Sequence, residues 1–253
     1  MLTTRRFTTL VALIIAAATF AATSAQGSAG STIISDKFDE EFSTNITDHT
    51  PNTDIVGNGW VVERGDWRVK NGSAREYSNA YWRHILDRRA VIDAGTADKS
   101  VEVEVKVDDF DDQFWGVVAR QSSETDWTMA FQDDIGDIVL GVKDSNEDQW
   151  GNPYSEYTPG AHLAGFQELG RIHHPMDKQR KSHKMKLVVS GDNIEVFANG
   201  QLVITATDTN HGGGTNAGIF ARGMDVHEFL KFTVTQGDTG GGGSKGGGNG
   251  KQK

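Results

Sequence analysis

The chain contains no cysteine, and several common functional motifs are missing from it. A domain of this size can build its core without disulfides, so the lack of cysteine leaves the redox environment open. The sequence has no phosphate-binding loop, zinc-ligand set or dinucleotide fingerprint. Basic residues are also few, with 25 Lys and Arg against 35 Asp and Glu. Nucleic acids and anionic membranes attract basic patches, so neither is an expected partner.

The longest apolar run, Leu10–Ala22, is too short to cross a membrane. It has about 13 residues, whereas a membrane-spanning helix needs roughly 20. It follows Arg5 and Arg6 and precedes Thr23-Ser24-Ala25, which is the layout of a cleavable secretory signal. The Arg5-Arg6 pair also suggests a twin-arginine signal, but the residues after it match poorly and favour the general export route. We expect residues 1–25 to be removed and the mature chain to be secreted or extracytoplasmic.

The far end of the chain cannot form a core. Gly237–Lys253 contains nine glycines and three lysines, and it has no apolar area to offset chain entropy. We expect a disordered tail, which fits either a natural tether or a remnant of cloning. Residues 26–236 remain, a length that suits one all-β domain. Without the signal, 23 basic and 35 acidic residues give a net charge of −12, which suits a soluble extracellular protein able to recruit divalent cations.

Alternating apolar and polar residues recur along nearly the whole domain, and no window has a sustained helical period. Val101, Val103 and Val105 alternate with charged residues, as in a half-buried strand. In "SGDNIEVFANGQLV", Asn199-Gly200 predicts a two-residue hairpin turn, and Asn71-Gly72 does the same earlier in the chain. Many short strands predict an all-β fold, a two-sheet antiparallel β-sandwich of the jelly-roll type. Trp60 and Trp67 are expected in its core.

The order of these segments resembles a known superfamily. "GWVVERGDWRVKNGSA", "VEVEVKV", "WGVVARQSSETDWTMAF", "HKMKLVVSGDNIEVFANGQLV", "AGIFARG" and "FLKFTV" follow one another between Phe38 and Val234. This order is similar to that of the laminin-G-like, concanavalin A-like jelly-roll superfamily. The resemblance implies a carbohydrate- or protein-binding module, often with calcium, or a glycosidase or lyase. A shared fold leaves the activity open.

The resemblance also directs attention to one catalytic motif. Retaining glucanases of the superfamily carry Glu-x-Asp-x-x-Glu on one strand, where one carboxylate attacks the sugar and another donates a proton. The nearest match here, Glu124 to Met129, has Met129 in the acid/base position. A thioether cannot transfer a proton, so this mechanism lacks a partner. A polar turn before a strand is the simpler interpretation of the match.

A candidate binding face comes from alternation within the predicted strands. Tyr81 and Arg83 share one face of their strand. Val117 and Ala119 are expected to face the core, which places Arg120 on the other side. In the next strand, Trp127, Met129 and Phe131 are expected to point inward and Gln132 outward. Arg83, Arg120 and Gln132 would then share an open sheet face, where ion pairing with surface carboxylates is the alternative role for the arginines.

Alternation fails between Asp144 and His183, and such a long excursion is often functional or mobile. Its aromatic residues Trp150, Tyr154 and Tyr157 could contact a ligand or pack within the loop itself. The segment opens with Asp144, Asn146 and Asp148, the Asp-x-Asn-x-Asp spacing of a calcium loop. A helix-loop-helix calcium site would need Gly at position 149, which is Gln here, so that type is not expected. Calcium at this or another oxygen-rich turn remains a hypothesis.

These observations favour an exported carbohydrate-binding module without its own catalysis. Its expected partner is a polysaccharide or glycan, and an extracellular protein is a further possible partner. The alternatives are a glycoside hydrolase or polysaccharide lyase of the same fold, and an extracellular matrix or envelope interaction module tethered by the glycine tail.

Overall fold

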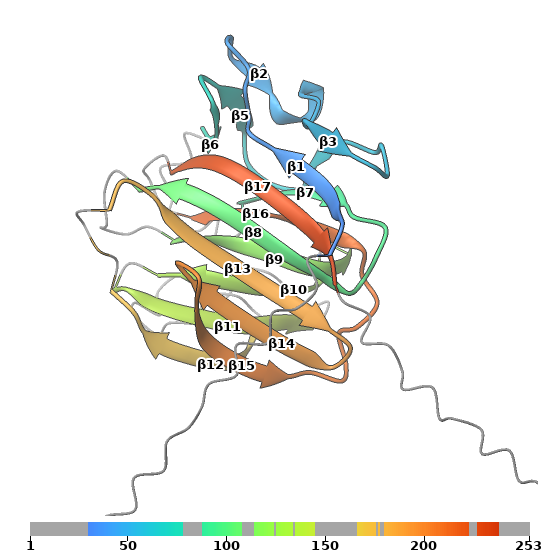
Figure 1. The fold of residues 1–253 in the computed structure, drawn as a ribbon, viewed down its shortest axis with the longest axis vertical. Coiled ribbons are helices and arrows are strands. Elements are labelled where there is room, and N and C mark those ends of the chain that lie inside the picture. The colour runs from blue at the N-terminus through green and yellow to red at the C-terminus, as the bar shows by residue number, and fades with distance from the viewer. Residues whose placement is uncertain are drawn as a thin grey trace, which may run out of the picture.

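Two antiparallel sheets build the protein, as a computed structural model shows (Figure 1). The structure describes residues 30–77, 88–107, 114–123, 125–133, 135–144, 166–175, 177, 180–222 and 227–237. In these ranges it contains seventeen strands and one short 3-10 helix, η1 (Ile46–Asp48). The predicted fold class, an all-β jelly-roll sandwich, is confirmed.

One sheet has ten strands. Eight of them lie in the order β15-β14-β13-β8-β17-β6-β5-β2, while β1 pairs with β17 and β3 pairs with β1. Their bounds are β1 Thr32–Asp36, β2 Thr44–Asn45, β3 Thr53–Asp54, β5 Trp67–Lys70, β6 Ser73–Glu76, β8 Lys99–Lys106, β13 His183–Ser190, β14 Asn193–Ala198, β15 Gln201–Thr207 and β17 Glu228–Gln236.

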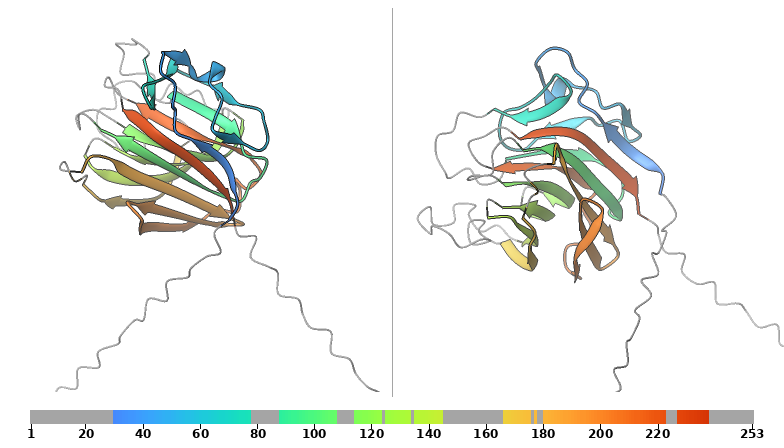
Figure 2. Two further views of the ribbon diagram at one scale, coloured as in Figure 1. Left: turned by 45° about the horizontal axis from the view of Figure 1, so that its top comes forward. Right: turned by 60° about the vertical axis from the view of Figure 1, so that its left-hand side comes forward.

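The other sheet has seven strands in the order β12-β11-β10-β9-β16-β7-β4. Their bounds are β4 Trp60–Val62, β7 Arg88–Asp93, β9 Phe114–Ser123, β10 Asp126–Gln132, β11 Asp137–Asp144, β12 Phe166–His173 and β16 Asn216–Arg222. The two further views show the sheets stacked as layers (Figure 2). Among the described residues no helix is long and apolar enough to cross a membrane.

Both predicted hairpins form. Asn199 and Gly200 have φ of 50° and 85° and connect β14 to β15, and Asn71 and Gly72 have φ of 52° and 77° and connect β5 to β6. Positive φ at both central residues is what a type I′ turn requires. Local sequence therefore determined these two connections.

The main core lies between the sheets. Val101, Val103 and Val105 of β8 point into it and are fully buried, while the residues between them are half-buried. Trp60 and Trp67 are 3% and 1% exposed and belong to the same core, as expected. One expectation is wrong, because the supposedly irregular stretch from Asp144 to His183 contains an entire strand, β12. Its sequence FQELGRIH is weakly apolar and has an interrupted alternation, so the pattern did not predict a strand.

Candidate functional site

The side of the seven-stranded sheet that faces away from the other sheet, termed the outer face, carries a second buried cluster. Ala130 of β10 pairs with Val117 of β9, and both belong to the core between the sheets. Their neighbours Met129 and Val118 also pair and therefore point to the outer face. The predicted orientation of β10 is thus wrong. Its sequence DWTMAFQ is apolar at both parities, so alternation alone could not say which face meets the core.

Aromatic rings form most of the outer-face cluster. Trp127 and Phe131 are buried, and the ring of Phe166 in β12 lies 6.4 Å from Trp127 and 6.0 Å from Phe131 between centroids. Phe166 sits directly over Gly141, where an added Cβ would lie only 2.1 Å from its Cζ. The guanidinium of Arg89 stacks on Trp127 at 4.8 Å from the ring, a favourable cation–π contact.

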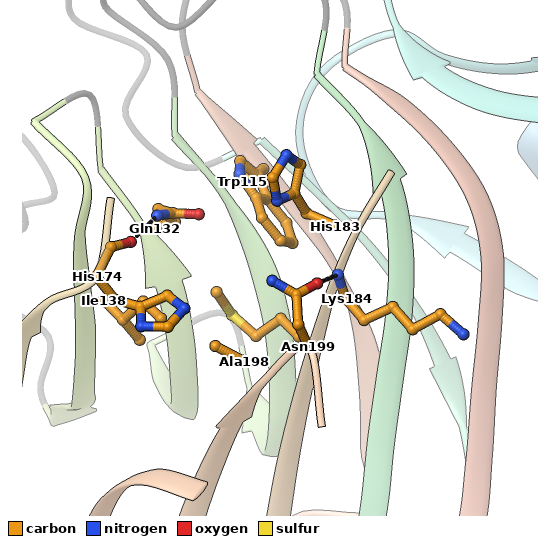
Figure 3. A pocket seen from close by; sticks show the side chains of 9 residues that line it. Trp115, Gln132, Ile138, His174, His183, Lys184, Ala198 and Asn199 are labelled. Carbon is orange, nitrogen blue, oxygen red and sulfur yellow. Dashed lines mark hydrogen bonds between the residues drawn. The ribbon is translucent and has the colours of Figure 1, made fainter. Parts of the chain in front are cut away.

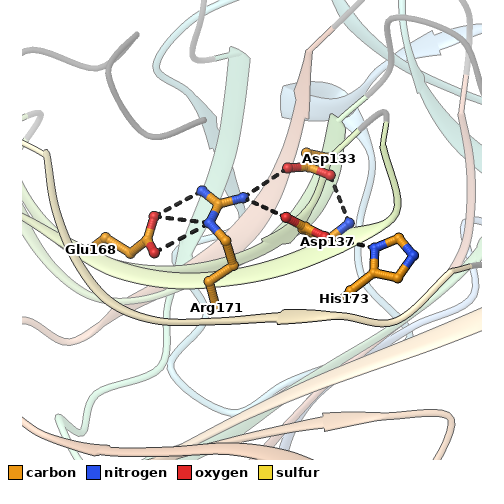
Figure 4. Close-up of polar contacts among 5 residues, drawn as sticks. All are labelled: Asp133, Asp137, Glu168, Arg171 and His173. Atoms are coloured by element: carbon orange, nitrogen blue, oxygen red, sulfur yellow. Dashed lines mark hydrogen bonds and ion pairs between the residues drawn. The ribbon is translucent and has the colours of Figure 1, made fainter. Parts of the chain in front are cut away.

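A polar network continues the outer face at its β11–β12 edge (Figure 4). Arg171 donates to three carboxylates: Nη1 to Asp133 Oδ2 and Asp137 Oδ2, both at 3.1 Å, and Nη2 to Glu168 Oε2 at 2.8 Å. His173 Nδ1 lies 2.8 Å from Asp137 Oδ1. The backbone N–H of Asp137 donates to Asp133 Oδ1 at 2.7 Å. These side chains form an acidic edge organised around one guanidinium.

The two aspartates of the network differ in their acidity. Burial raises the pKa of Asp133 above its ordinary value, despite the hydrogen bond from the backbone of Asp137. Burial also acts to raise the pKa of Asp137, but His173 and Arg171 lower it more, so the net shift is downward. The side chain of Asp133 is only 1% exposed, whereas that of Glu168 is 36% exposed. The accessible oxygens therefore belong mainly to Glu168 and Asp137.

At another point of the same face lies a buried amide without a partner. Gln121 pairs with Asn216, which by alternation shares the outer face with Phe220. Gln121 is 1% exposed, and neither its amide oxygen nor its amide nitrogen has a hydrogen bond to any residue that the structure describes. An unmade hydrogen bond of a buried polar group costs free energy. The buried amide of Gln121 is therefore expected to lower the stability of the fold.

Arg120 does not lie on an open face, which corrects the expectation that it shares one with Gln132. It sits in a β-bulge of β9 with φ of 51° and is 1% exposed. Its Nη2 donates to Asp98 Oδ1 at 3.0 Å and to the carbonyl of Gly191, both beside the ten-stranded sheet. The bulge turns the side chain across the end of the sandwich. The buried side chain of Arg120 therefore links the two sheets by hydrogen bonds.

Gln132 also points between the sheets, into a small rim pocket (Figure 3). Its Nε2 donates to the carbonyl of His174 at 2.8 Å. The pocket has about 10 Å³ of usable space, about what a single water needs. Trp115 and His183 line it, and burial lowers the pKa of His183 below its ordinary value. A sugar ring does not fit in this space.

Most other predicted site residues lie outside the described part of the chain. They are Tyr81, Arg83, Trp150, Tyr154 and Tyr157 for carbohydrate, and Asn146 and Asp148 for metal. Asp144 ends β11, and its side chain is not described. In the ranges that are described, no group of three or more His, Cys, Asp or Glu could hold a metal ion. The calcium site therefore remains a prediction.

The sequence interpretation missed the polar edge network. A spacing of three puts Glu168 and Arg171 on opposite faces of a regular strand. In the structure, Gly141 pairs with Glu168 while Leu140 pairs with Gly170, so Leu169 is an extra residue. This irregularity brings Glu168 and Arg171 to the same face. Asp133 and Asp137 gave no stronger signal in the sequence than that of an oxygen-rich turn.

The structure shows the surroundings of Met129, the residue at the acid/base position of the glucanase motif. Met129 lies on the outer face and is fully buried within the apolar cluster. Asp126 begins β10 and accepts a hydrogen bond from Ser122 Oγ, while Glu124 lies outside the described residues. The Glu-x-Asp-x-x-Glu arrangement thus has a thioether packed among aromatic rings in its third position.

Two solved structures with TM-scores above 0.5 confirm the sandwich fold. The laminarinase from Rhodothermus marinus is 11% identical and aligns with a TM-score of 0.51, covering 82% of this chain and 98% of its own. The GH43 BlXynB protein from Bacillus licheniformis is 15% identical with a TM-score of 0.51. The match covers 80% of this chain but only 39% of that larger protein. The carbohydrate-binding module CBM66 from Bacillus subtilis has 14% identity and a TM-score of 0.45, covering 70% and 92% of the two chains.

Sequence comparison gives one family. No curated protein matches the chain at a significant level. The family model described as glycosyl hydrolases family 32 C terminal matches residues 71–236, which span all strands from the β5–β6 turn to the end of β17. The match covers well over half of the chain. The expectation of a concanavalin A-like jelly roll is thereby confirmed, while its laminin-G-like part stays a prediction. The chain belongs to the glycosyl hydrolases family 32 C-terminal family.

Proposed function

We propose that this domain binds a polysaccharide or glycan and has no catalysis of its own. The family takes its name from the C-terminal part of glycosyl hydrolases, which supports a role on carbohydrate. The apolar Met129 in place of a carboxylic acid supports binding over hydrolysis. Secretion is also part of the proposal, because a carbohydrate-binding module acts where its polymer is found.

The arrangement around Arg171 is the observation that carries the proposal. Four of the five N–H groups of a guanidinium are accounted for by its bonds to three carboxylates. The carboxylates are thereby fixed in position, and each oxygen has lone pairs beyond those bonds. Fixed acceptors suit sugar hydroxyls, which can donate. The exposed His173 and Glu168 extend this polar edge toward solvent.

A second candidate, a glycosidase or lyase, is favoured by one specific observation. The pKa of Asp133 is raised while that of Asp137 is lowered. Two neighbouring acids with pKa values shifted apart are the usual arrangement for an acid and a base. The 1% exposure of the Asp133 side chain weighs against this role, since a general acid must reach its substrate.

Affinity electrophoresis on a polysaccharide panel, with reducing-sugar and unsaturated-product assays on the same polymers, tests both candidates. We expect retardation on at least one polymer without product release. Glu168→Gln and His173→Ala should reduce retardation. The matched control is Glu195→Gln, because Glu195 is a half-buried residue of β14 in the ten-stranded sheet, and this variant should keep normal retardation. Retardation on no polymer contradicts the proposal, and product release lost in Asp133→Asn establishes the enzyme instead.

The same assay tests the predicted calcium requirement. We propose that calcium bound at Asp144, Asn146 and Asp148 supports glycan binding. Chelation by EDTA should then weaken retardation, and added calcium should restore it. Unchanged retardation in EDTA would remove calcium from the proposal without affecting carbohydrate binding itself.

A further inference from the structure

A buried histidine near the N-terminus has a carboxylate on each ring nitrogen. His49 follows η1, and its side chain has no exposed surface. Its Nε2 lies 2.9 and 3.0 Å from the two oxygens of Asp36, and its Nδ1 lies 2.9 Å from Glu40 Oε1. A neutral imidazole has one N–H and can donate to only one of them. While both carboxyls are ionised, two such partners require the imidazolium, which donates from both nitrogens.

Asp36 is the centre of this arrangement. It ends β1, is fully buried and also accepts from Trp60 Nε1 at 2.8 Å and from the backbone N–H of Phe38 at 2.9 Å. A buried carboxylate with these donors is stable only while they stay in place. The imidazolium supplies the positive charge. Asp36, His49 and Trp60 thereby connect β1, the end of η1 and β4.

The segment held in this way, residues 37–59, is termed the N-terminal strap. It brings Phe38 and Ile46 into the core, and the Phe38 ring lies 6.0 Å from Trp60, which in turn lies 4.9 Å from Phe232. Its regular pairing is limited to two strands of two residues each, β2 and β3. Beyond these strands, the amides of Asn71 and Ile55 connect the strap to the rest of the sheet through the carbonyls of Glu40 and Ile33. The buried side-chain contacts of His49 add to these backbone bonds in keeping the strap in place.

We propose that His49 is a pH-sensitive latch, which holds the N-terminal strap closed as an imidazolium and releases it when the proton is lost. On deprotonation, one ring nitrogen becomes an acceptor that faces a carboxylate, and a charge-assisted bond turns into a repulsive contact. Asp36 then lacks its counter-charge in a buried position. The strap opens locally while the two sheets stay folded.

The charges around the ring agree with this inference. Asp36 faces it from β1 and Glu40 from the segment between β1 and β2, while the neutral indole of Trp60 and ring of Phe38 complete the surroundings. Burial lowers the pKa of His49, but Asp36 and Glu40 raise it more, so the net pKa lies above 6.5. A raised folded-state pKa contributes stability that is complete below the unfolded value and is lost as pH rises through the folded value.

Two measurements on the full chain test the latch. Nitrogen-15 NMR of the imidazole should show both nitrogens of His49 protonated at pH 6. Hydrogen exchange of the amides in residues 37–59, corrected for the base-catalysed intrinsic rate, should then accelerate at least about tenfold across the measured His49 titration, as the loss of a charge-assisted bond predicts. Amides of β8 and β9 should keep their protection over the same range.

Variants separate the latch from a general effect of pH. His49→Gln should give strap exchange that is fast at pH 6 and no longer depends on pH. His211→Gln is the matched control, because the buried His211 also contacts a carboxylate, Asp208 Oδ2 at 2.8 Å from its Nδ1, but lies outside the strap. It should leave strap exchange as in the wild type. A neutral His49 ring at pH 6, or corrected exchange that stays flat through its titration, overturns the inference. The wild-type NMR and exchange data decide the matter even if His49→Gln fails to fold.

Discussion

Lys99 and Arg120 cross between the two sheets in opposite directions at the same end of the sandwich. From β8 of the ten-stranded sheet, Lys99 donates through Nζ to the carbonyls of residues 214–216, before and at the start of β16. From β9 of the seven-stranded sheet, Arg120 reaches Asp98 and Gly191. Both side chains are at most 1% exposed. Two buried basic side chains thus link the two sheets at this end of the sandwich.

Lys99 should make stability depend on pH. Burial lowers its pKa from 10.5 to about 7, against the opposing influence of Asp93. The unfolded chain then binds more protons between pH 7 and 10.5, so this residue raises stability as pH rises in that range. We expect the free energy of unfolding of the wild type, relative to Lys99→Met, to increase by about 2 kcal/mol from pH 7 to pH 9. Urea unfolding at both pH values measures it, and parallel curves for the two proteins would contradict the assignment.

Arg120→Met should lower stability and leave glycan affinity unchanged. The substitution leaves Asp98 and the Gly191 carbonyl without their cation. Asp98 is partly exposed, so water compensates in part, and the expected loss is about 1–3 kcal/mol. Thermal unfolding and affinity electrophoresis below the melting temperature measure the two effects. Reduced glycan affinity with an unchanged melting temperature would indicate that Arg120 contacts the ligand, as predicted from the sequence.

Gln121→Met should stabilise the protein. The amide of Gln121 is buried without a hydrogen-bond partner in the described part of the chain, and a thioether of similar length removes the cost of the unmade bonds. The expected gain is about 1 kcal/mol. A clear loss of stability would mean that the amide has a partner in solution, such as an ordered water, and loss of glycan binding would identify that partner as the ligand.

Gly141→Ala should disturb the outer face. The new Cβ would lie within 2.1 Å of the Phe166 ring and 2.7 Å of the Gln167 carbonyl oxygen. The ring must move away from Trp127 and Phe131, at an expected cost of about 1–3 kcal/mol. Gly213→Ala is the matched control, because no atom lies within 4 Å of its added Cβ. Equal melting temperatures for the two variants would show that Phe166 does not rest on Gly141.

Alternation and turn residues together determined the fold class. Val101, Val103 and Val105 alternate because β8 has one face in the core, and Asn-Gly pairs adopt positive φ at little cost. These preferences are local, and they can be read from the chain without knowledge of its neighbours. The core positions of Trp60 and Trp67 were predicted correctly for the same reason.

Which side of a strand faces the core was decided by the tertiary structure alone. In β10, apolar residues occur at both parities, and the pairing of Ala130 with Val117 selects the face that meets the other sheet. Glu168 meets Arg171 because β12 has an extra residue relative to β11, and Arg120 is buried because β9 has a bulge of its own. A one-residue change of register moves a side chain to the opposite face, and the register depends on partners distant in sequence. The sequence by itself therefore determined the sandwich and its hairpins, whereas packing between distant strands decided which charged residues share a surface.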